Sequence, residues 1–200
     1  GAGQVVGYRI DLHTPNAQAQ AFLWSADAGI LDFGTLGGSQ SSALAINDAG
    51  WVVGASDVDS GTTSRSHAFR WTSDGGMIDL NDLLPPGSGW ELRVASDINA
   101  AGQIVGAATT PDHEGHAFLW SDSGGLRDLG ALSPHSSNVA HAVNASGQAV
   151  GYGYVWGVMH AAFFYGGAAV DLNDLIPLDA GPYLSGRGAL AARHQRHPDR

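Results

Sequence analysis

The chain of 200 residues repeats one ordered set of four short motifs along its length. The first motif has the form Gly-x-φ-Val-Gly, where φ is an apolar residue or Ala. It stands at Gly3–Gly7, Gly50–Gly54, Gly102–Gly106 and Gly147–Gly151, so its starting positions are 47, 52 and 45 residues apart. Such periods are typical of repeat architectures, in which each supersecondary unit stacks on the next. This repeat constrains the fold more than any other feature of the sequence.

The other three motifs follow the first in a fixed order. An aromatic motif stands at Ala21–Trp24, Ala68–Trp71, Ala117–Trp120 and Ala162–Tyr165. An Asp step follows at Asp32-Phe33, Asp79-Leu80, Asp128-Leu129 and Asp171-Leu172, and a motif ending in Asn stands at Ala45–Asn47, Asp97–Asn99 and Ala142–Asn144. Apolar residues rich in β-branched and aromatic types, bounded by Gly, Asn and Asp, are typical of short strands joined by turns.

Four strands in about 45–52 residues are the content of one β-propeller blade. We therefore predict an all-β fold of tandem four-stranded repeats, about 3.75 propeller-like blades that form an incomplete or open propeller, with no helix. The Asn-ending strand, which carries small residues such as Ala43 and Ala95, is expected to be innermost. The Val, Phe–Trp and Asp–Leu strands follow outward. A β-sandwich or a β-solenoid could hold the same fourfold repetition.

The repeat divides the chain into units at about 1–38, 39–84, 85–132 and 133–177, which we expect to form a single repeat domain. The first unit begins on its second strand. Residues 178–200 depart from the pattern and hold four of the nine Arg, so we expect a weakly ordered tail or a poor closing strand. We expect the chain to be part of a longer array; closure as a four-bladed ring and a shifted reading frame at the C-terminus are the alternatives.

The motifs resemble the HAF repeat of bacteria, named for steps such as His67-Ala68-Phe69 and His116-Ala117-Phe118. The resemblance covers about residues 1–177. It implies a tandem β-rich protein that is extracellular or on the cell surface and has no established molecular activity, although residues 1–6 do not form a signal peptide. Gln20 replaces the motif His in the first unit, and His160-Ala161-Ala162-Phe163 has one extra Ala in the fourth.

Composition excludes several classes of function. The formal net charge of −10 disfavours binding to the phosphates of nucleic acid and to anionic membrane surfaces. The chain has no Cys, hence no disulfide and no thiolate metal site, and no apolar run is long enough to span a membrane. No motif for a nucleophilic Ser, a zinc protease, a phosphate loop or a dinucleotide cofactor is present. We predict no cofactor and no metal.

The polar residues that recur in the motifs are expected to be structural. Asn47, Asn99 and Asn144 are suited to close Asx turns, and His67, His116 and His160 to bridge strands or blades by hydrogen bonds. Gln20 supports this interpretation because Gln retains a donor and an acceptor but cannot act as a base. The Asp-x-Asn sequences at Asp79 and Asp171 resemble calcium ligands, but no full calcium loop follows. Leu83, Leu84, Leu175 and Ile176 continue as core-like residues, and Asp is interpreted as the cap of a turn.

The loops between the second and third strands vary between units, as binding loops on a rigid frame do. In a propeller they share one rim with the connections between blades. They contain the candidate ligand-binding residues Asp11, His13, Asp57, Asp59, Asp112, His113 and Glu114. Three further Trp residues lie outside the aromatic motif: Trp51, Trp90 and Trp156. Such rings pack between blades more often than they stack on a sugar.

We expect a non-enzymatic, exported repeat domain that acts as a scaffold or binding module for a surface protein or glycan. The alternative is a propeller hydrolase or lyase that uses the acidic residues and His of the rim. Carboxylates within about 5–10 Å of one another around a pocket would favour the enzyme. The ligand and the oligomeric state are not encoded in any recognisable motif.

Overall fold

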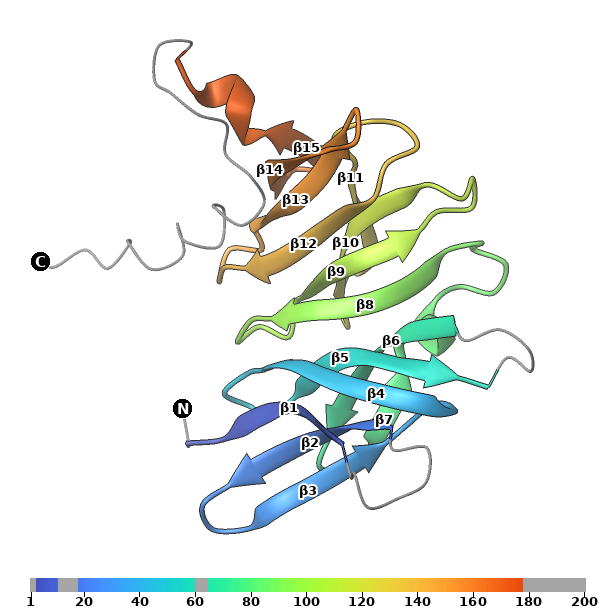
Figure 1. Cartoon of the computed structure of the whole chain (residues 1–200), viewed down its shortest axis with the longest axis vertical. Coiled ribbons are helices and arrows are strands. Elements are labelled where there is room, and N and C mark those ends of the chain that lie inside the picture. The colour runs from blue at the N-terminus through green and yellow to red at the C-terminus, as the bar shows by residue number, and fades with distance from the viewer. Residues whose placement is uncertain (1–2, 11–17, 60–64, 178–200) are drawn as a thin grey trace, which may run out of the picture.

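A computed structural model describes residues 3–10, 18–59 and 65–177 of the chain. The fold is all-β, and its four antiparallel sheets are stacked in chain order (Figure 1). The strands of each sheet follow one another as a meander, and in the second, third and fourth sheets the Asn-ending strand is innermost and the Asp–Leu strand outermost. The predicted all-β architecture is confirmed, as an open propeller-like arrangement. The predicted tail at 178–200 lies outside the described residues.

The first sheet has three strands and the others have four. The first comprises β1 (Val5–Ile10), β2 (Ala19–Ser25) and β3 (Gly29–Gly34). The second comprises β4 (Gly37–Ile46), β5 (Val52–Val58), β6 (Arg65–Thr72) and β7 (Gly76–Asp79). The third comprises β8 (Glu91–Ile98), β9 (Ile104–Thr109), β10 (Gly115–Ser121) and β11 (Gly125–Gly130). The fourth comprises β12 (Asn138–Val143), β13 (Ala149–Val155), β14 (Val158–Tyr165) and β15 (Ala168–Asp171).

Neighbouring sheets pack by one recurring contact. The innermost strand of each four-stranded sheet lies across the Val strand and the Phe–Trp strand of the sheet before it: β4 on β1 and β2, β8 on β5 and β6, and β12 on β9 and β10. Buried apolar side chains fill these interfaces, among them Phe69 and Phe118 of the third strands. The core is therefore a series of interfaces between sheets rather than one central cluster, as expected for a repeat protein.

The Asn that ends each innermost strand builds the turn that follows it. Asn47 Oδ1 accepts hydrogen bonds from the backbone N–H groups of Ala49 and Trp51, each at 3.0 Å. Gly50 takes the left-handed backbone that the turn requires, with φ of 78°. Asn99 and Asn144 make the same pairs of contacts in their own turns. These Asn side chains thus stabilise the fold.

The same Asn residues also join one sheet to the next. Asn47 Nδ2 donates to the carbonyl of Asn99 at 3.1 Å, and Asn99 Nδ2 donates to the carbonyl of Asn144 at 2.8 Å. We call this chain of bonds the Asn ladder. It runs along the innermost strands and fixes the spacing of the second, third and fourth sheets.

A close backbone contact leaves no room for a side chain at the last Gly of the first motif in the second, third and fourth units. The innermost strands β4, β8 and β12 each contain a β-bulge next to the residue that pairs with this Gly. A carbonyl of that strand then lies where a Cβ would stand. An added Cβ would be 2.0 Å from Ser42 O at Gly54, 1.8 Å from Val94 O at Gly106 and 1.9 Å from Val139 O at Gly151.

The register of the fourth sheet corrects the predicted alignment of the fourth unit. Asp171 pairs with Ala162, whereas Asp32, Asp79 and Asp128 pair with Phe22, Phe69 and Phe118. Ala162 therefore occupies the Phe position, and Ala161 is not an insertion. The segment between the Phe position of the third strand and the motif Asp of the fourth is shorter in this unit than in the others. The residue is lost in the β14–β15 hairpin, where the two-residue turn Gly166-Gly167 replaces the three-residue loops of the other sheets.

Two short 3₁₀ helices, η1 (Leu80–Leu83) and η2 (Leu172–Leu175), correct the prediction that the chain contains no helix. Each begins at an Asp whose side chain accepts a hydrogen bond from the N–H two residues on, from Asn81 or Asn173. The helical turn directs Leu83 and Leu175 to solvent, so these two residues are not part of the core. No helix in the described parts of the chain is long and apolar enough to cross a membrane.

The close contact at Gly106 predicts the effect of adding one methyl group. Gly106→Ala is expected to lower the free energy of unfolding by about 3 kcal/mol, because the methyl must displace the backbone of β8. Gly7→Ala is the matched control, since an added Cβ there meets only the Phe22 ring, at 3.4 Å. Its stability is expected to stay within about 0.5 kcal/mol of wild type. Urea denaturation followed by circular dichroism measures both, and equal losses would contradict the role of the bulge.

Candidate functional site

The motif His of the third strand pairs with the motif Asp of the fourth strand in three sheets. His67 Nδ1 lies 2.5 Å from Asp79 Oδ2, His116 Nδ1 lies 2.9 Å from Asp128 Oδ1, and His160 Nδ1 lies 2.5 Å from Asp171 Oδ2. Each pair bridges two neighbouring strands of one sheet. The pairs lie in three separate sheets, and this separation favours a structural role for the His residues.

In the first sheet Arg9 replaces the missing His. Gln20 stands at the His position, and Arg9 is its cross-strand neighbour on β1. The Arg9 guanidinium binds the Asp32 carboxylate through two bonds, of 2.7 Å and 2.5 Å. Gln20 Nε2 instead donates to the backbone carbonyl of Ser39. Arg9 on the adjacent strand therefore makes the contact to Asp32 that the motif His makes in the other sheets.

These contacts lower the pKa of three Asp residues. Burial alone would raise the pKa of Asp79, but hydrogen bonds from His67 and Asn81 outweigh burial and hold it below its ordinary value. Asp171 has a lowered pKa for the same reasons, with His160 and Asn173 as donors. The bidentate bond from Arg9 lowers the pKa of Asp32.

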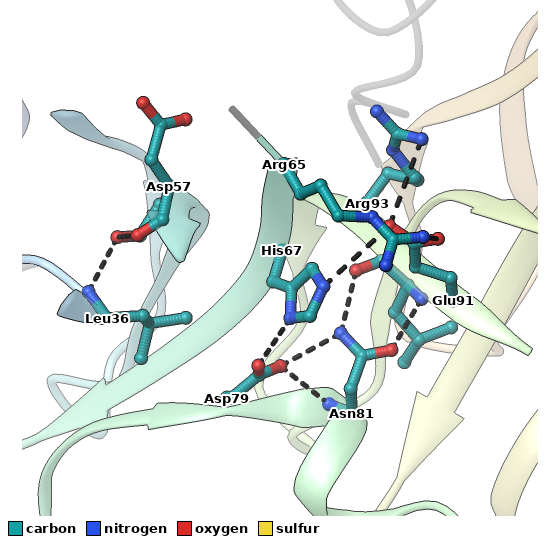
Figure 2. A network of polar contacts seen from close by, with 10 residues as sticks. Leu36, Asp57, Arg65, His67, Asp79, Asn81, Glu91 and Arg93 are labelled. Carbon is teal, nitrogen blue, oxygen red and sulfur yellow. Dashed lines mark hydrogen bonds and ion pairs between the residues drawn. The ribbon is translucent and has the colours of Figure 1, made fainter. Parts of the chain in front are cut away.

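A polar network connects the second and third sheets (Figure 2). Asn81 makes a two-way contact with the backbone of Leu92: its Oδ1 accepts from the N–H at 2.7 Å and its Nδ2 donates to the carbonyl at 3.0 Å. Glu91 binds Arg65 at 2.8 Å, and Glu91 Oε1 lies 3.7 Å from His67 Nε2. The Asp79–Asn81 pair that resembled a calcium site therefore caps η1 and holds β8.

Two of the three Trp residues outside the aromatic motif pack between sheets. The Arg70 guanidinium lies between the Trp51 ring of its own sheet, at 4.8 Å, and the Trp120 ring of the third sheet, at 5.3 Å. Such cation–π contacts stabilise partly buried interfaces. Trp90 packs against the second and third sheets and contacts the His116 ring edge-on.

The described candidate ligand-binding residues, Asp57, Asp59, Asp112, His113 and Glu114, lie where the loops between second and third strands meet the connections between sheets. Ser39 Oγ donates to Asp57 Oδ2 at 3.0 Å, and the Asp57 side chain points away from the polar network of Figure 2. Glu114 accepts from the His135 backbone N–H at 2.5 Å, and its carboxylate also contacts the ring nitrogen Nδ1 of that residue. Asp59, Asp112 and His113 are exposed. Asp11 and His13 lie outside the described residues.

A pocket of about 490 Å³ opens on this rim beside Trp156, and we call it the Trp156 pocket. Tyr154, Trp156 and Gly157 line it from the β13–β14 hairpin, and residues 133–137 line it from the connection between β11 and β12. The Trp156 side chain is almost wholly in solvent, with 95% of its surface exposed. The expectation that such a ring packs between sheets is wrong for Trp156, because a hairpin turn carries it beyond the sheet.

The connection that forms one wall of the Trp156 pocket is held by a buried amide. Asn138 Oδ1 accepts from the Leu132 N–H at 2.9 Å, while Asn138 Nδ2 donates to the Gly115 carbonyl at 2.9 Å and to Ser136 Oγ at 3.0 Å. Glu114 holds the same connection through His135. The wall is therefore fixed at both ends before any ligand arrives.

The rim also concentrates unfavourable backbone conformations. Among the described residues, three non-glycine residues have positive φ: His113 at 64°, His135 at 56° and Trp156 at 52°. All three lie on the rim, in loops or a hairpin turn. Left-handed backbone is costly for bulky side chains and is concentrated at functional sites in proteins. The geometry thus singles out this rim independently of its composition.

Comparison of the chain with protein-family models, curated proteins and solved structures finds no match in any of the three. The likeness to the HAF repeat therefore rests on the motifs of the chain itself and stays a prediction. In the three described stretches of chain, no group of three or more His, Asp or Glu side chains is placed to hold a metal ion.

The sequence interpretation did not select His135, Tyr154 or Asn138. His135 and Asn138 lie in a connection that matches no repeat motif, and their contacts depend on residues about 20 positions away. Trp156 lies outside the aromatic motif, as Trp51 and Trp90 also do. Its exposure follows from the short hairpin Val155–Val158, in which Trp156 and Gly157 form the two-residue turn.

The lowered pKa of Asp79 predicts a pH-dependent effect of Asp79→Asn. Because the pKa is lower in the folded chain than in the unfolded chain, the ionised carboxylate stabilises the fold above about pH 4, and this contribution is lost as the pH falls through the folded pKa. We expect Asp79→Asn to cost about 1.5 kcal/mol at pH 5.5 and progressively less as the pH falls below about 4.

Asp128→Asn is the matched control, because the Asp128 side chain is 44% exposed and that of Asp79 only 13%. A smaller cost is expected for it. Urea denaturation across this pH range measures both variants. A difference between Asp79→Asn and wild type that does not change with pH would contradict the assignment.

Proposed function

We propose that this protein is a non-enzymatic, exported binding domain whose rim holds a glycan, with Trp156 as the stacking platform. The observation that carries the proposal is the almost complete exposure of the Trp156 ring at the mouth of the Trp156 pocket. The ring stands beside the Trp156 pocket, so its flat apolar face is placed to stack on a ligand held there.

The chemistry of the pocket supports a sugar as the ligand. A sugar ring offers an apolar face of C–H groups and an edge of hydroxyls, and the indole of Trp156 is flat, apolar and rigid. Tyr154 adds a second ring, and Ser133, Ser136 and Ser137 bring hydroxyl and backbone groups that can exchange hydrogen bonds with the sugar edge. The ring of His135, which lines this pocket, is already in contact with the Glu114 carboxylate.

Preorganisation also supports binding at this place. Asn138 and Glu114 fix one wall of the pocket, and the two-residue turn at Trp156-Gly157 fixes the other. A ligand then meets a surface that loses little conformational freedom on binding.

The contacts of the rim acids favour a binding module over the hydrolase or lyase alternative. Glycoside hydrolysis needs two carboxyl groups facing each other across the scissile bond. Asp57 is held by Ser39 at the second sheet, and Glu114 is held by His135 at the third. The resemblance to an extracellular bacterial repeat supports export, and the acidic composition supports a partner other than nucleic acid.

Trp156→Ala is predicted to abolish glycan binding while the chain remains folded. Tyr165→Ala is the matched control: Tyr165 is an exposed ring at the end of β14 far from the Trp156 turn, with 58% of its surface in solvent. Binding of both variants to immobilised glycans and to soluble polysaccharides, followed by affinity electrophoresis, measures the effect. Equal binding by Trp156→Ala and wild type would reject the platform, and no glycan bound by wild type would reject the ligand class.

Trp156→Asn is predicted to be more stable than wild type and inactive in binding. Asn and Gly are the preferred residues of a two-residue hairpin turn with positive φ at both positions, whereas Trp is strained there. The gain in the free energy of unfolding is expected to be about 1 kcal/mol. Thermal denaturation together with the same binding assay checks both effects. A variant that is less stable than wild type would contradict the strain at this turn.

A further inference from the structure

His135 stands in the wall of the Trp156 pocket, with a ring that is exposed and yet held in place. Its side chain is 88% exposed, and a side chain so exposed ordinarily keeps its rotamer freedom. Here one oxygen of the Glu114 carboxylate accepts from the backbone N–H of His135 at 2.5 Å, and the other contacts the ring nitrogen Nδ1. The two oxygens of one carboxylate therefore fix both the backbone and the ring of the same residue.

The contact with Glu114 also decides which ring nitrogen of His135 carries the hydrogen. An ionised carboxylate only accepts hydrogen bonds, so its partner Nδ1 is the N–H of the neutral ring. The other nitrogen, Nε2, then has a lone pair and no hydrogen. Among the described residues both polar contacts of His135 are to Glu114, which leaves this lone pair for a ligand.

The neighbouring hydroxyl of Ser136 offers the pocket the same kind of group. Ser136 Oγ donates its one hydrogen to the Ser133 carbonyl at 2.6 Å and accepts from Asn138 Nδ2 at 3.0 Å. It therefore has no hydrogen left for a ligand and only one lone pair. The Ser136 and His135 side chains both present acceptors, so they match a ligand that supplies hydroxyl or N–H donors.

The charges at this wall disfavour a ligand that is an anion. The Glu114 carboxylate stands against the His135 ring, and none of the described residues that line the pocket is Arg. The chain has no Lys and a formal net charge of −10. The carboxylate of a uronic acid or the sulfate of a sulfated sugar has no hydrogen to donate and would meet lone pairs and negative charge. Such like-charge juxtaposition acts against the wrong partner.

We propose that His135 determines the specificity of the Trp156 pocket: its Nε2 accepts a hydrogen bond from a sugar hydroxyl and selects a neutral glycan over a uronate or sulfated one. Glu114 is the positioning residue, because it acts only through His135. This inference rests on the proposed glycan-binding function and deepens it by naming the class of glycan. The Trp156 ring supplies the stacking contact, and the His135 ring reads the edge of the same sugar.

The binding test uses the full chain and two sets of polysaccharides, laminarin and galactomannan as neutral glycans and polygalacturonate and heparin as anionic ones. Affinity electrophoresis is expected to rank a neutral glycan first. His135→Ala is expected to weaken this binding about fivefold, the effect of one lost hydrogen bond. His113→Ala is the matched control, because His113 is also exposed and left-handed, at φ of 64°, but does not line the pocket. It should bind as wild type does.

A second measurement reads the hydrogen on the ring directly and needs no glycan. Long-range proton–nitrogen NMR at pH 8 distinguishes the two neutral forms of each His ring. His135 is expected to carry its hydrogen on Nδ1 in wild type. Glu114→Ala removes the acceptor beside Nδ1 and is expected to lower the fraction of this form, whereas a merely structural role of Glu114 would leave the ring hydrogen where it is.

Three results would overturn the proposal and leave the proposed function in place. One is polygalacturonate or heparin bound more tightly than either neutral glycan and released by Trp156→Ala. Another is His135→Ala binding as tightly as wild type. The third is a wild-type His135 ring with its hydrogen on Nε2. Binding of none of the four polysaccharides, or binding that Trp156→Ala does not change, would instead reject the glycan site itself and this inference with it.

Discussion

The close approach of a bulged strand to a glycine is the contact on which the rest of the structure depends. The carbonyls of Ser42, Val94 and Val139 occupy the space that a side chain would take at Gly54, Gly106 and Gly151. This approach holds each innermost strand against the second strand of its own sheet, and the rings of Phe69 and Phe118 lie beside the glycines of the second and third sheets. The Asn turns and the His–Asp pairs add contacts within each sheet, and the Asn ladder and the contact of Asn81 with Leu92 join one sheet to the next.

The parts of the fold that follow from repetition could be predicted from sequence. Two local patterns have local physical causes: an apolar pair bounded by Gly forms a strand, and Asn followed three residues later by Gly forms a turn. The strand order and the turns could therefore be predicted from them. The fourth unit was misaligned because Phe163 and Phe164 offered two possible matches to one motif. Only the pairing of Asp171 with Ala162, which depends on hairpin length, distinguishes them. The 3₁₀ helices were missed because Leu83 and Leu175 looked apolar enough for the core.

The candidate site depends on contacts that no local pattern encodes. Arg9 compensates for Gln20 only because β1 and β2 bring the two residues opposite each other. Glu114 reaches His135, and Asn138 reaches Gly115, across loops of adjacent sheets. The sequence indicated that the rim loops vary and carry function. Which of their side chains meet was decided by the stacking of the sheets, and the strained backbone at Trp156 has no signature beyond the unusual pair Trp156-Gly157.

The Asn ladder gives the stack a polarity. Each rung donates an amide from the earlier unit to a carbonyl of the later unit, so the two ends of a run of sheets are chemically unlike. A complete unit inserted or removed within the run would restore the same donor and acceptor at the junction. A partial unit would not. Gene duplication and loss can therefore change the length of such an array in whole units without redesigning an interface, in the manner of a head-to-tail polymer.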